Sequence, residues 1–496
     1  MYFSGESSMI YRNIHIISGA VSERLRGLRE ESRTVSMYTI DFEKPCRVHF
    51  IGIGGISMSG LAEILLTRGF TVSGSDIRES VLTGRLRDAG AKVFVPQKAS
   101  NIGRPDVVVY TAAIHPDNPE FQEAERRRIP MMTRAELLGE LMLNYREAIN
   151  VAGTHGKTTT TSMIAQILLE AGQDPTVTVG GMLKSIGGNI RVGHDRNFLA
   201  EACEYTNSFL SFYPTLSVVL NVEADHLDFF RDIEDIRNSF RAFIRRLPQD
   251  ERGFLVINGD IQNAEYFLDG LKCGYATFGK NPEYDYAARN IVYDGQARAE
   301  YGLLVHGEDA GTVRLGVPGQ HNVYNSLAAL AVSDRLGIDR KTAVAVLEHY
   351  TGTDRRFEYR GETGGFTVID DYAHHPQEIT ATLKTAQMYP HKKVYVIFQP
   401  HTYTRTKALM NEFAKALLLC DEVILPDIYP ARETDTLGIS SNDLAKRINQ
   451  IGGSANYIPE NTKIIQFVRE NLKPGDLLIT MGAGNVDKLA DELLGE

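Results

Sequence analysis

Short apolar runs alternate with segments of helical periodicity from residue 47 onward. After Arg47, the sequence Val-His-Phe-Ile leads into a glycine turn at residues 52–55, and residues 58–67 have helical periodicity. Further apolar runs, each short enough for a buried strand, stand at residues 70–73, 91–95 and 107–110. Strands that alternate with helices are typical of βαβ units in a parallel sheet, so we expect an α/β domain over residues 45–145.

The same alternation restarts twice. A strand near residue 148 breaks into Gly-Thr-His-Gly-Lys-Thr-Thr ahead of a helix that ends near Gly172, and residues 275–315 show β-like alternation with no obvious helix. Beyond a polar stretch at residues 351–356 the strand and helix rhythm begins again. We therefore predict a central domain over residues 146–350 and a third α/β domain over residues 351–496.

Residues 1–36 show no sustained periodicity, and we expect a disordered leader over residues 1–44. Met37 stands just before the first strong strand pattern. Translation from Met37 is therefore an alternative start.

Composition narrows the class of protein. The 496 residues include 53 Lys and Arg against 63 Asp and Glu, which gives a net charge of -10, so no overall field favours nucleic acid or an anionic membrane. No run of about 18 apolar residues predicts a membrane span. Four cysteines without metal-ligand spacing fit a reducing cytoplasm. Any phosphate-binding site must therefore be local.

The segment from Gly153 to Thr159 has the most informative chemistry. Its glycines permit a tight loop whose backbone N–H groups face a phosphate at the start of a helix. Lys157 adds a positive charge, and Thr158 offers a hydroxyl to Mg²⁺. The spacing departs from the usual eight-residue pattern, because Val151 stands where a glycine is expected. We predict a cradle for a nucleoside triphosphate, with an ordinary strand-to-helix turn as the alternative.

Polar residues follow two further predicted strands of the central domain. Glu201 comes directly after residues 197–200, where a parallel sheet places its ligands, and it suits Mg²⁺; Glu204 is the competing candidate. His226 follows the strand at residues 216–220 and would coordinate or orient a second metal. A structural histidine and a surface glutamate are the alternatives.

The first glycine turn approximates a dinucleotide fingerprint. Ser57 occupies the third glycine position, and Asp76 stands 22 residues after Gly54 at the end of the second strand. A nucleotide diphosphate fits such a turn, whereas the match to NAD is weak. The alternative is a glycine turn that only shapes the backbone and binds no ligand.

Two loops of the third domain also follow predicted strands. Residues 370–376 and 399–406 stand at strand ends, and Arg405 suits bidentate binding of an α-carboxylate. Helix caps and surface loops are the alternative.

The ordered set of motifs resembles the Mur ligases, and within that family the ligases that join L-alanine to UDP-N-acetylmuramate. The resemblance runs from about Arg47 to the C-terminus and rests on GIGGISMSGLAE, GTHGKTTT, EACEYTNSFL, NVEADHLDFF, PGQHNVYNSLAALAV, DRRFEYRG, DDYAHHP and FQPHTYTRT. Two positions depart from the family pattern. Thr402 stands where the family often has arginine, and EACEY is commonly richer in aspartate.

This resemblance implies an α/β fold of three domains: an N-terminal Rossmann-like domain for the UDP moiety, a central P-loop ATPase domain and a C-terminal Rossmann-like domain for the amino acid. It further implies ATP and Mg²⁺ as cofactors. ATP would be bound by the loop from Gly153 to Thr159, which comprises Gly153, Thr154, His155, Gly156, Lys157, Thr158 and Thr159, and by Asn322, Asn325, Arg355, Arg356 and Asp371.

The remaining roles follow in the same way. The metal would lie on Thr158, Glu201 and His226, and Lys157, Glu201 and His226 would be catalytic. UDP-sugar binding is expected at Gly52, Gly54, Gly55, Ile56, Ser57 and Asp76. The amino acid is expected at His374, His375 and Arg405.

The expected reaction is formation of UDP-N-acetylmuramoyl-L-alanine, ADP and phosphate through an acyl phosphate, in the cytoplasm, by a monomer or homo-oligomer. Three rivals remain open. A nicotinamide-dependent oxidoreductase would use the first glycine turn but would give the central phosphate loop no function. A nucleotide-binding regulator would not need Glu201, His226 and Arg405. A recycling ligase would attach an intact peptide to the same sugar nucleotide.

Overall fold

The computed structural model describes residues 38–227, 229–431 and 433–495. The chain divides into two compact units, Met1–Asn144 and Tyr145–Glu496. The predicted leader falls almost wholly outside the described residues, as does the alternative start at Met37. In the part of the chain that is described, no helix combines the length and apolar character that a membrane span requires.

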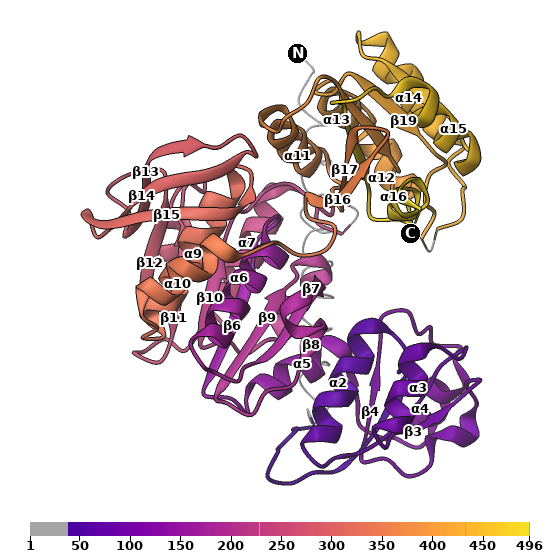
Figure 1. Ribbon diagram of the computed structural model, residues 1–496. Coiled ribbons are helices and arrows are strands. Elements are labelled where there is room, and N and C mark those ends of the chain that lie inside the picture. Colours follow the sequence, from indigo (N-terminus) through magenta and orange to yellow (C-terminus); the bar gives the residue numbers. More distant parts are fainter. Residues whose placement is uncertain (1–37, 228, 432, 496) are drawn as a thin grey trace, which may run out of the picture. The chain divides into compact units, whose positions relative to one another are not determined.

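The first unit contains a five-stranded parallel sheet (Figure 1). Its strand order is β3-β2-β1-β4-β5, with bounds β1 Arg47–Ile51, β2 Thr71–Ser75, β3 Lys92–Phe94, β4 Val107–Tyr110 and β5 Met131–Thr133. The helices are α2 Ile56–Thr67, α3 Val81–Asp88, α4 Pro119–Arg126 and α5 Arg134–Met142, with a 3₁₀ turn at Ala99–Ile102. Almost every residue of β1 and β4 is buried, as expected for central strands of a parallel sheet.

The second unit begins with a ten-stranded sheet in the order β15-β14-β13-β12-β11-β10-β6-β9-β7-β8. Its parallel part consists of β6 Glu147–Ala152, β7 Thr176–Leu183, β9 Asn197–Ala202, β10 Leu216–Val219, β11 Phe254–Asn258 and β12 Gly274–Gly279, whereas β8 Gly188–Arg191 is antiparallel to β7. The predicted alternation at residues 275–315 corresponds to β12 and to the antiparallel strands β13 Tyr286–Tyr293, β14 Arg298–Val305 and β15 Glu308–Pro318.

The helices of this part give it a core. They are α6 Lys157–Glu170, α7 Ile233–Ile244, α8 Glu265–Leu268, α9 His321–Arg335 and α10 Arg340–His349, with 3₁₀ turns at Lys184–Ile186 and Tyr205–Ser211. Apolar side chains of α6, α9 and α10 pack with the sheet in one large cluster. Strand β6 lies between β9 and β10, so the carboxyl ends of these three strands lie side by side.

The rest of the second unit is a six-stranded sheet in the order β16-β17-β21-β18-β19-β20. Its strands are β16 Glu358–Thr363, β17 Phe366–Asp371, β18 Val394–Phe398, β19 Glu422–Leu425, β20 Ala455–Tyr457 and β21 Leu477–Met481, and all are parallel except β16. The helices are α11 Pro376–Met388, α12 Tyr403–Ala408, α13 Met410–Leu417, α14 Ser441–Gln450, α15 Asn461–Asn471 and α16 Asp487–Leu494.

Alternate residues of this second sheet face two different cores. Val396 and Phe398 pack with helices α11, α13 and α14, whereas Tyr395 and Ile397 pack with α15 and α16. A period of two along a strand produces this division, because successive side chains point to opposite faces. The sheet is therefore covered on both faces, which is typical of a doubly wound α/β arrangement.

Two strands extend further than the sequence pattern predicted. Glu201 lies within β9, because the ladder to β6 continues through Val151 and Ala152. Asp370 and Asp371 lie within β17, where the ladder to β21 continues to Met481. The hydrophobic pattern stops before these acidic residues, but the backbone pairing does not.

Candidate functional site

A strand-to-helix loop at residues 153–156 forms one wall of the site. Strand β6 ends at Ala152 and α6 begins at Lys157, with Gly156 at φ 84°. A Cβ atom on Gly156 would lie 2.6 Å from Oδ1 of Asn325, so the turn requires glycine for both conformation and space. Asn221 braces the loop, since its Oδ1 accepts from the N–H of His155 at 2.7 Å.

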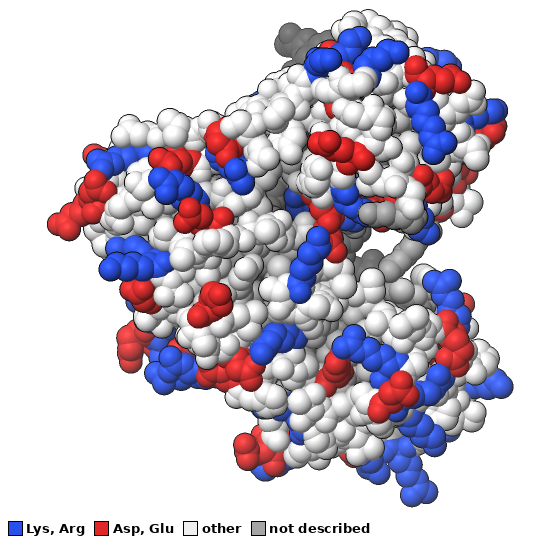
Figure 2. All heavy atoms as spheres, viewed as in Figure 1, with Lys and Arg blue, Asp and Glu red and all other residues white. Residues whose placement is uncertain are grey.

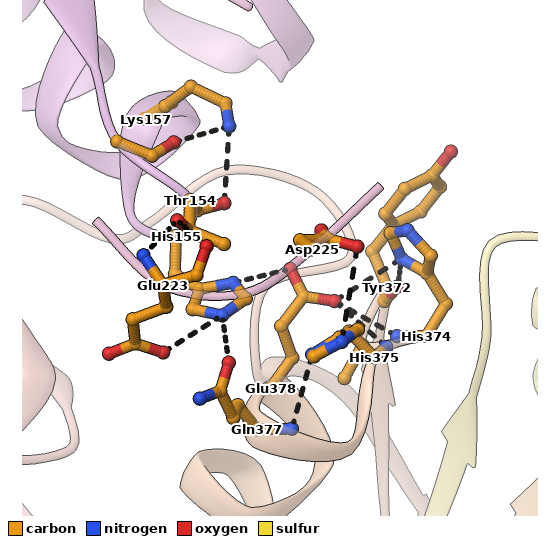
Figure 3. A network of polar contacts seen from close by, with 12 residues as sticks. Thr154, His155, Lys157, Glu223, Asp225, Tyr372, His374, His375, Gln377 and Glu378 are labelled. Carbon is orange, nitrogen blue, oxygen red and sulfur yellow. Dashed lines mark hydrogen bonds and ion pairs between the residues drawn. The ribbon is translucent and has the colours of Figure 1, made fainter. Parts of the chain in front are cut away.

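Lys157 lies at the start of α6 with its ammonium group turned back onto the loop. Nζ donates to the carbonyl oxygens of Gly153 at 2.5 Å and Thr154 at 3.1 Å, as Figure 3 shows in part, and it pairs with Oε2 of Glu204 at 3.0 Å. Burial opposes the charge, but Glu204 outweighs it, and the net effect raises the pKa of Lys157. A fixed cation thus lies beside the N-terminus of a helix, where an anion is already favoured.

Glu201 offers oxygen ligands on the neighbouring strand. Its Oε1 accepts from the N–H of Gly180 at 2.5 Å, and its side chain bonds Thr158. Burial raises the pKa of this carboxyl group. Among the residues that the structure describes, no three or more His, Cys, Asp or Glu side chains form a metal cluster. One carboxylate and one hydroxyl suit Mg²⁺, which keeps several waters and takes phosphate oxygens.

His226 lies close to Tyr205, Glu204 and Asp225. The backbone of His226 has φ 53°, and the centroid of its ring lies 4.5 Å from the ring centroid of Tyr205. Nε2 is 3.9 Å from Oε1 of Glu204 and 3.6 Å from Oδ2 of Asp225. His226 is therefore held by an aromatic ring on one side and by carboxylates on the other.

A cavity of about 900 Å³ joins these groups to residues of the six-stranded sheet. The predicted ATP and metal residues that line it are Thr154, His155, Gly156, Lys157, Thr158, Thr159, Glu201, His226, Asn322, Asn325, Arg356 and Asp371. Asn322 and Asn325 are buried on α9 and bonded to each other at 2.9 Å. The cavity is large enough for a nucleotide.

The structure distinguishes two neighbouring arginines. Arg355 donates to Asp370 at 2.9 Å and to the carbonyl oxygens of Gly482 and Gly484 at 2.6 and 3.0 Å, so its guanidinium holds two segments of the six-stranded sheet together. Arg356 lines the cavity with its guanidinium 5.3 Å from the ring of Tyr372. Of the two arginines, only Arg356 is a lining residue of the cavity.

Asp371 lies on the same wall. It is buried, and its oxygens accept from the N–H groups of Phe357 and Ala373, each at 2.8 Å. Burial raises the pKa of Asp371 to about 6.

The segment from Tyr372 to Glu378 brings one of the three predicted amino-acid residues, His374, to the cavity, whereas His375 is not among the lining residues. His374 lines it, with Nδ1 3.0 Å from the carbonyl oxygen of Tyr372, and burial lowers the pKa of its ring. His375 is the N-cap of α11 and lies 3.9 Å from Asp225, and burial lowers its pKa to about 4. Arg405, on α12, is not a lining residue, but its charge lowers the pKa of His374.

Several lining residues escaped the sequence analysis. They are Asn258, Asp260, Lys280, Tyr324, Gln377 and Glu378. One carried a usable signal: Glu378 stands three residues after His375 with a proline between them, which is the pattern of a capping box at a helix start.

The first unit contains the other predicted turn. Its Gly54 N–H donates to Oδ2 of Asp76 at 2.9 Å, and the N–H groups of Gly52 and Ile53 donate to the carbonyl oxygen of Ser75. Gly55 is the N-cap of α2, which places Ile56 and Ser57 in its first turn. Asp76 thus shapes the turn through a hydrogen bond to its backbone.

The face of the molecule drawn in Figure 2 has no dominant sign of charge. Figure 2 shows Lys and Arg side chains lying among Asp and Glu side chains across the face in view. Binding of an anion therefore depends on local groups such as Lys157 and the helix N-terminus.

Comparison with known proteins gives three successive family matches. Residues 47–146 match the catalytic domain of the Mur ligase family, residues 151–333 the Mur ligase middle domain, and residues 355–484 the glutamate ligase domain of Mur ligases. A UDP-N-acetylmuramate–L-alanine ligase of Lachnospira eligens is 58% identical over 460 residues, covering 92% of this chain and 100% of that protein.

Two solved structures are also similar. A UDP-N-acetylmuramate–alanine ligase from Thermotoga maritima has 30% identity and a TM-score of 0.75, over 91% of this chain and 98% of that one. A murein peptide ligase from Psychrobacter arcticus has 25% identity and a TM-score of 0.65, over 91% of this chain and 98% of that one.

Proposed function

Because this chain belongs to the Mur ligase family, we propose that it joins L-alanine to the lactyl carboxylate of UDP-N-acetylmuramate with hydrolysis of ATP. The products are UDP-N-acetylmuramoyl-L-alanine, ADP and phosphate. One observation carries the proposal: the phosphate loop with Lys157 and the segment with His374 line the same cavity. We also propose domain limits of 45–145, 146–350 and 351–496, which the positions of the three family matches support.

The loop from Gly153 to Thr159 would bind the phosphates of ATP, and Asn322 and Asn325 would lie on its adenine side. Lys157 is already charged and would exchange Glu204 for phosphate oxygens. Arg356 and Asp371 would reach the nucleotide from the six-stranded sheet. Thr158 and Glu201 would hold Mg²⁺, which supplies positive charge to the transferring phosphoryl group, and His226 would lie near a second ion.

The chemistry has two balanced steps. A lactyl carboxylate oxygen attacks the γ-phosphorus of ATP, ADP leaves, and an acyl phosphate forms. The amine of L-alanine then attacks the acyl carbon, loses a proton and expels phosphate to leave an amide. Lys157 and Arg356 stabilise the charge that develops on the phosphoryl oxygens.

Residues of the six-stranded sheet would hold the amino acid. His374 donates from Nδ1 to a backbone carbonyl, which leaves the lone pair of Nε2 to accept a hydrogen bond from the amine. Arg405 would attract the α-carboxylate. The UDP moiety would be bound by the turn of the first unit, at Gly52, Gly54, Gly55, Ile56, Ser57 and Asp76. We place the reaction in the cytoplasm, where ATP is available and the four free cysteines stay reduced.

A second candidate is ligation of an intact peptide to the same sugar nucleotide. It is favoured by the likeness to the Psychrobacter arcticus murein peptide ligase. The greater identity to a UDP-N-acetylmuramate–L-alanine ligase, 58% against 25%, supports L-alanine.

The test is release of ADP and phosphate from ATP in the presence of Mg²⁺ and UDP-N-acetylmuramate. L-alanine, glycine, L-serine and a cell-wall tripeptide are added in separate reactions. We expect turnover to be fastest with L-alanine. Turnover with the tripeptide alone would show that the protein is a peptide ligase. Release of ADP without any acceptor would show that it is not a ligase.

A further inference from the structure

Glu378 places its two carboxylate oxygens against two different parts of the second unit. Oε2 accepts from the backbone N–H groups of His374 and His375, at 3.1 and 3.3 Å, and lies 3.3 Å from Nδ1 of His374. Oε1 lies 3.5 Å from Nδ1 of His155 in the phosphate loop. Figure 3 shows the carboxylate between the two segments.

His155 is held by the same helix on its other ring nitrogen. Its Nε2 lies 3.1 Å from Oε1 of Gln377 and 3.6 Å from Oε2 of Glu223. Gln377 and Glu378, which follow Pro376 on α11, therefore both contact the side chain of His155 in the phosphate loop. Because His155 lies between Gly153 and Gly156, any rearrangement of that loop moves the ring against Glu378.

The arrangement exceeds what a helix cap requires. A capping box uses one carboxylate oxygen to accept from the N-cap backbone, and Oε2 does this for His375. The other oxygen is free to point into solvent in an ordinary cap, but here it faces the partly buried imidazole of His155. Burial alone would raise the pKa of Glu378, yet His374 and His155 hold it well below its usual range, so the group is a carboxylate.

We propose that Glu378 is a positioning residue that couples the phosphate loop to the amino-acid segment, so that ATP and L-alanine strengthen each other's binding. The inference rests on the function proposed above, which places ATP at the loop and the amino acid at His374. Phosphates that fix the loop also fix His155, and a fixed His155 orients Glu378 and hence the backbone of His374. Coupling of this kind is reciprocal by thermodynamic necessity.

The experiment compares wild type with Glu378→Gln, His155→Asn and the double variant in the full-length enzyme. Glutamine keeps an oxygen to cap α11 but removes the charge that faces His155. His155→Asn leaves the cap untouched. In the amino-acid segment, the His155 ring contacts Glu378, Gln377 and, at 5.7 Å between ring centroids, His375. The KM for L-alanine is measured at saturating ATP and UDP-N-acetylmuramate, together with kcat.

We expect each single variant to raise the KM for L-alanine about tenfold with a smaller change in kcat, and the double variant to resemble the single ones. Effects that multiply in the double variant, or a KM for L-alanine unchanged by His155→Asn, would overturn the coupling. If Glu378→Gln does not fold, His155→Asn still tests the coupling of the phosphate loop to the amino-acid segment, and a KM for L-alanine that it leaves unchanged overturns the proposal.

Asp443→Asn is the matched control. Asp443 completes the capping box of α14 in the same part of the chain but is not a cavity residue. It should leave both kinetic constants unchanged. Wild-type enzyme that forms no product with L-alanine would refute the proposed function itself, whereas normal wild-type turnover with independent variants would refute only the coupling.

Discussion

The two glycine turns of the molecule have the same local architecture and different electrostatics. Each follows a buried parallel strand and opens a helix. In the first unit the N–H of Gly54 donates to a carboxylate of the chain itself, Asp76, at 2.9 Å. In the second unit the turn is followed by Lys157, whose ammonium group lies over the loop carbonyls.

The difference shows that glycine spacing fixes the backbone shape while neighbouring side chains decide which ligand the turn suits. The partial positive charge at a helix N-terminus attracts anions, and a carboxylate of the chain at that position partly neutralises this charge. A lysine adds to the attraction instead. We therefore assign the triphosphate to the second turn, and the UDP-sugar role of the first turn remains a prediction.

Removal of Lys157, which distinguishes the second turn from the first, should have the largest effect on activity. Lys157→Ala should lower kcat/KM for ligation about 10³-fold, because a preorganised charge beside the transferring phosphoryl group is lost. Binding of UDP-N-acetylmuramate, measured by calorimetry, should not change. Lys341→Ala is the control, since Lys341 lies in the first turn of α10 and is exposed. Ligation at the wild-type rate by Lys157→Ala would remove the distinction between the turns.

The next largest effect separates the two candidate metal carboxylates. Glu201→Gln should reduce turnover about 100-fold and raise the Mg²⁺ concentration needed for half-maximal rate, because a hard oxygen ligand is worth several kcal/mol. Glu204→Gln should change the Mg²⁺ requirement much less, since Glu204 pairs with Lys157. The assignment of Glu201 is wrong if a Mg²⁺ titration shows the larger shift for Glu204→Gln.

The pH dependence of stability offers a third test, confined to the second unit. His375 has a folded pKa of about 4, and an unfolded histidine titrates near 6.5. Between pH 7 and pH 5 the unfolded chain takes up a proton that the folded chain does not, so the free energy of unfolding falls as pH falls. His375 should account for about 2 kcal/mol of that loss.

His375→Asn isolates this contribution, because asparagine is a good N-cap and does not titrate. Hydrogen exchange of α11 at pH 7 and pH 5 measures the change. The variant should lose less protection than wild type on acidification. Equal losses in the two proteins would mean that His375 is protonated in the fold.

The smallest expected effect concerns the first turn. Asp76→Ala removes the acceptor for the N–H of Gly54 and should lower local stability at residues 52–57 by about 1 kcal/mol, because this partly exposed hydrogen bond is discounted for solvent. Hydrogen exchange of that segment reports the change, and Asp76→Asn, which keeps an acceptor, should restore most of it. A rise in the KM for ATP would contradict the separation of roles.

Strands that are buried on both faces were predictable from the sequence. Residues 394–398 form a continuous apolar run and are β18, because a central parallel strand has no solvent-facing side. The strand ends were not predictable in the same way. Glu201 and Asp371 interrupt the apolar pattern, and only pairing with β6 and β21 shows that they still belong to strands.

The chemistry of the phosphate loop was also visible in the sequence, but its surroundings were not. His155 contacts Gln377 across 222 residues of chain, and no local pattern announces such a contact. Arg355 and Arg356 were equivalent candidates in the sequence. In the fold, Arg355 has φ 61° and its guanidinium is bonded to Asp370. Tertiary contacts of this kind depend on the fold as a whole.

The most direct test of the account is the transfer of oxygen from substrate to phosphate. UDP-N-acetylmuramate with oxygen-18 in its lactyl carboxylate is incubated with enzyme, ATP, Mg²⁺ and L-alanine, and the released phosphate is analysed by mass spectrometry. Activation of the carboxylate at the phosphate loop predicts one labelled oxygen in each phosphate released with product. Unlabelled phosphate alongside normal amide formation would contradict the acyl phosphate, and with it the role given to Lys157.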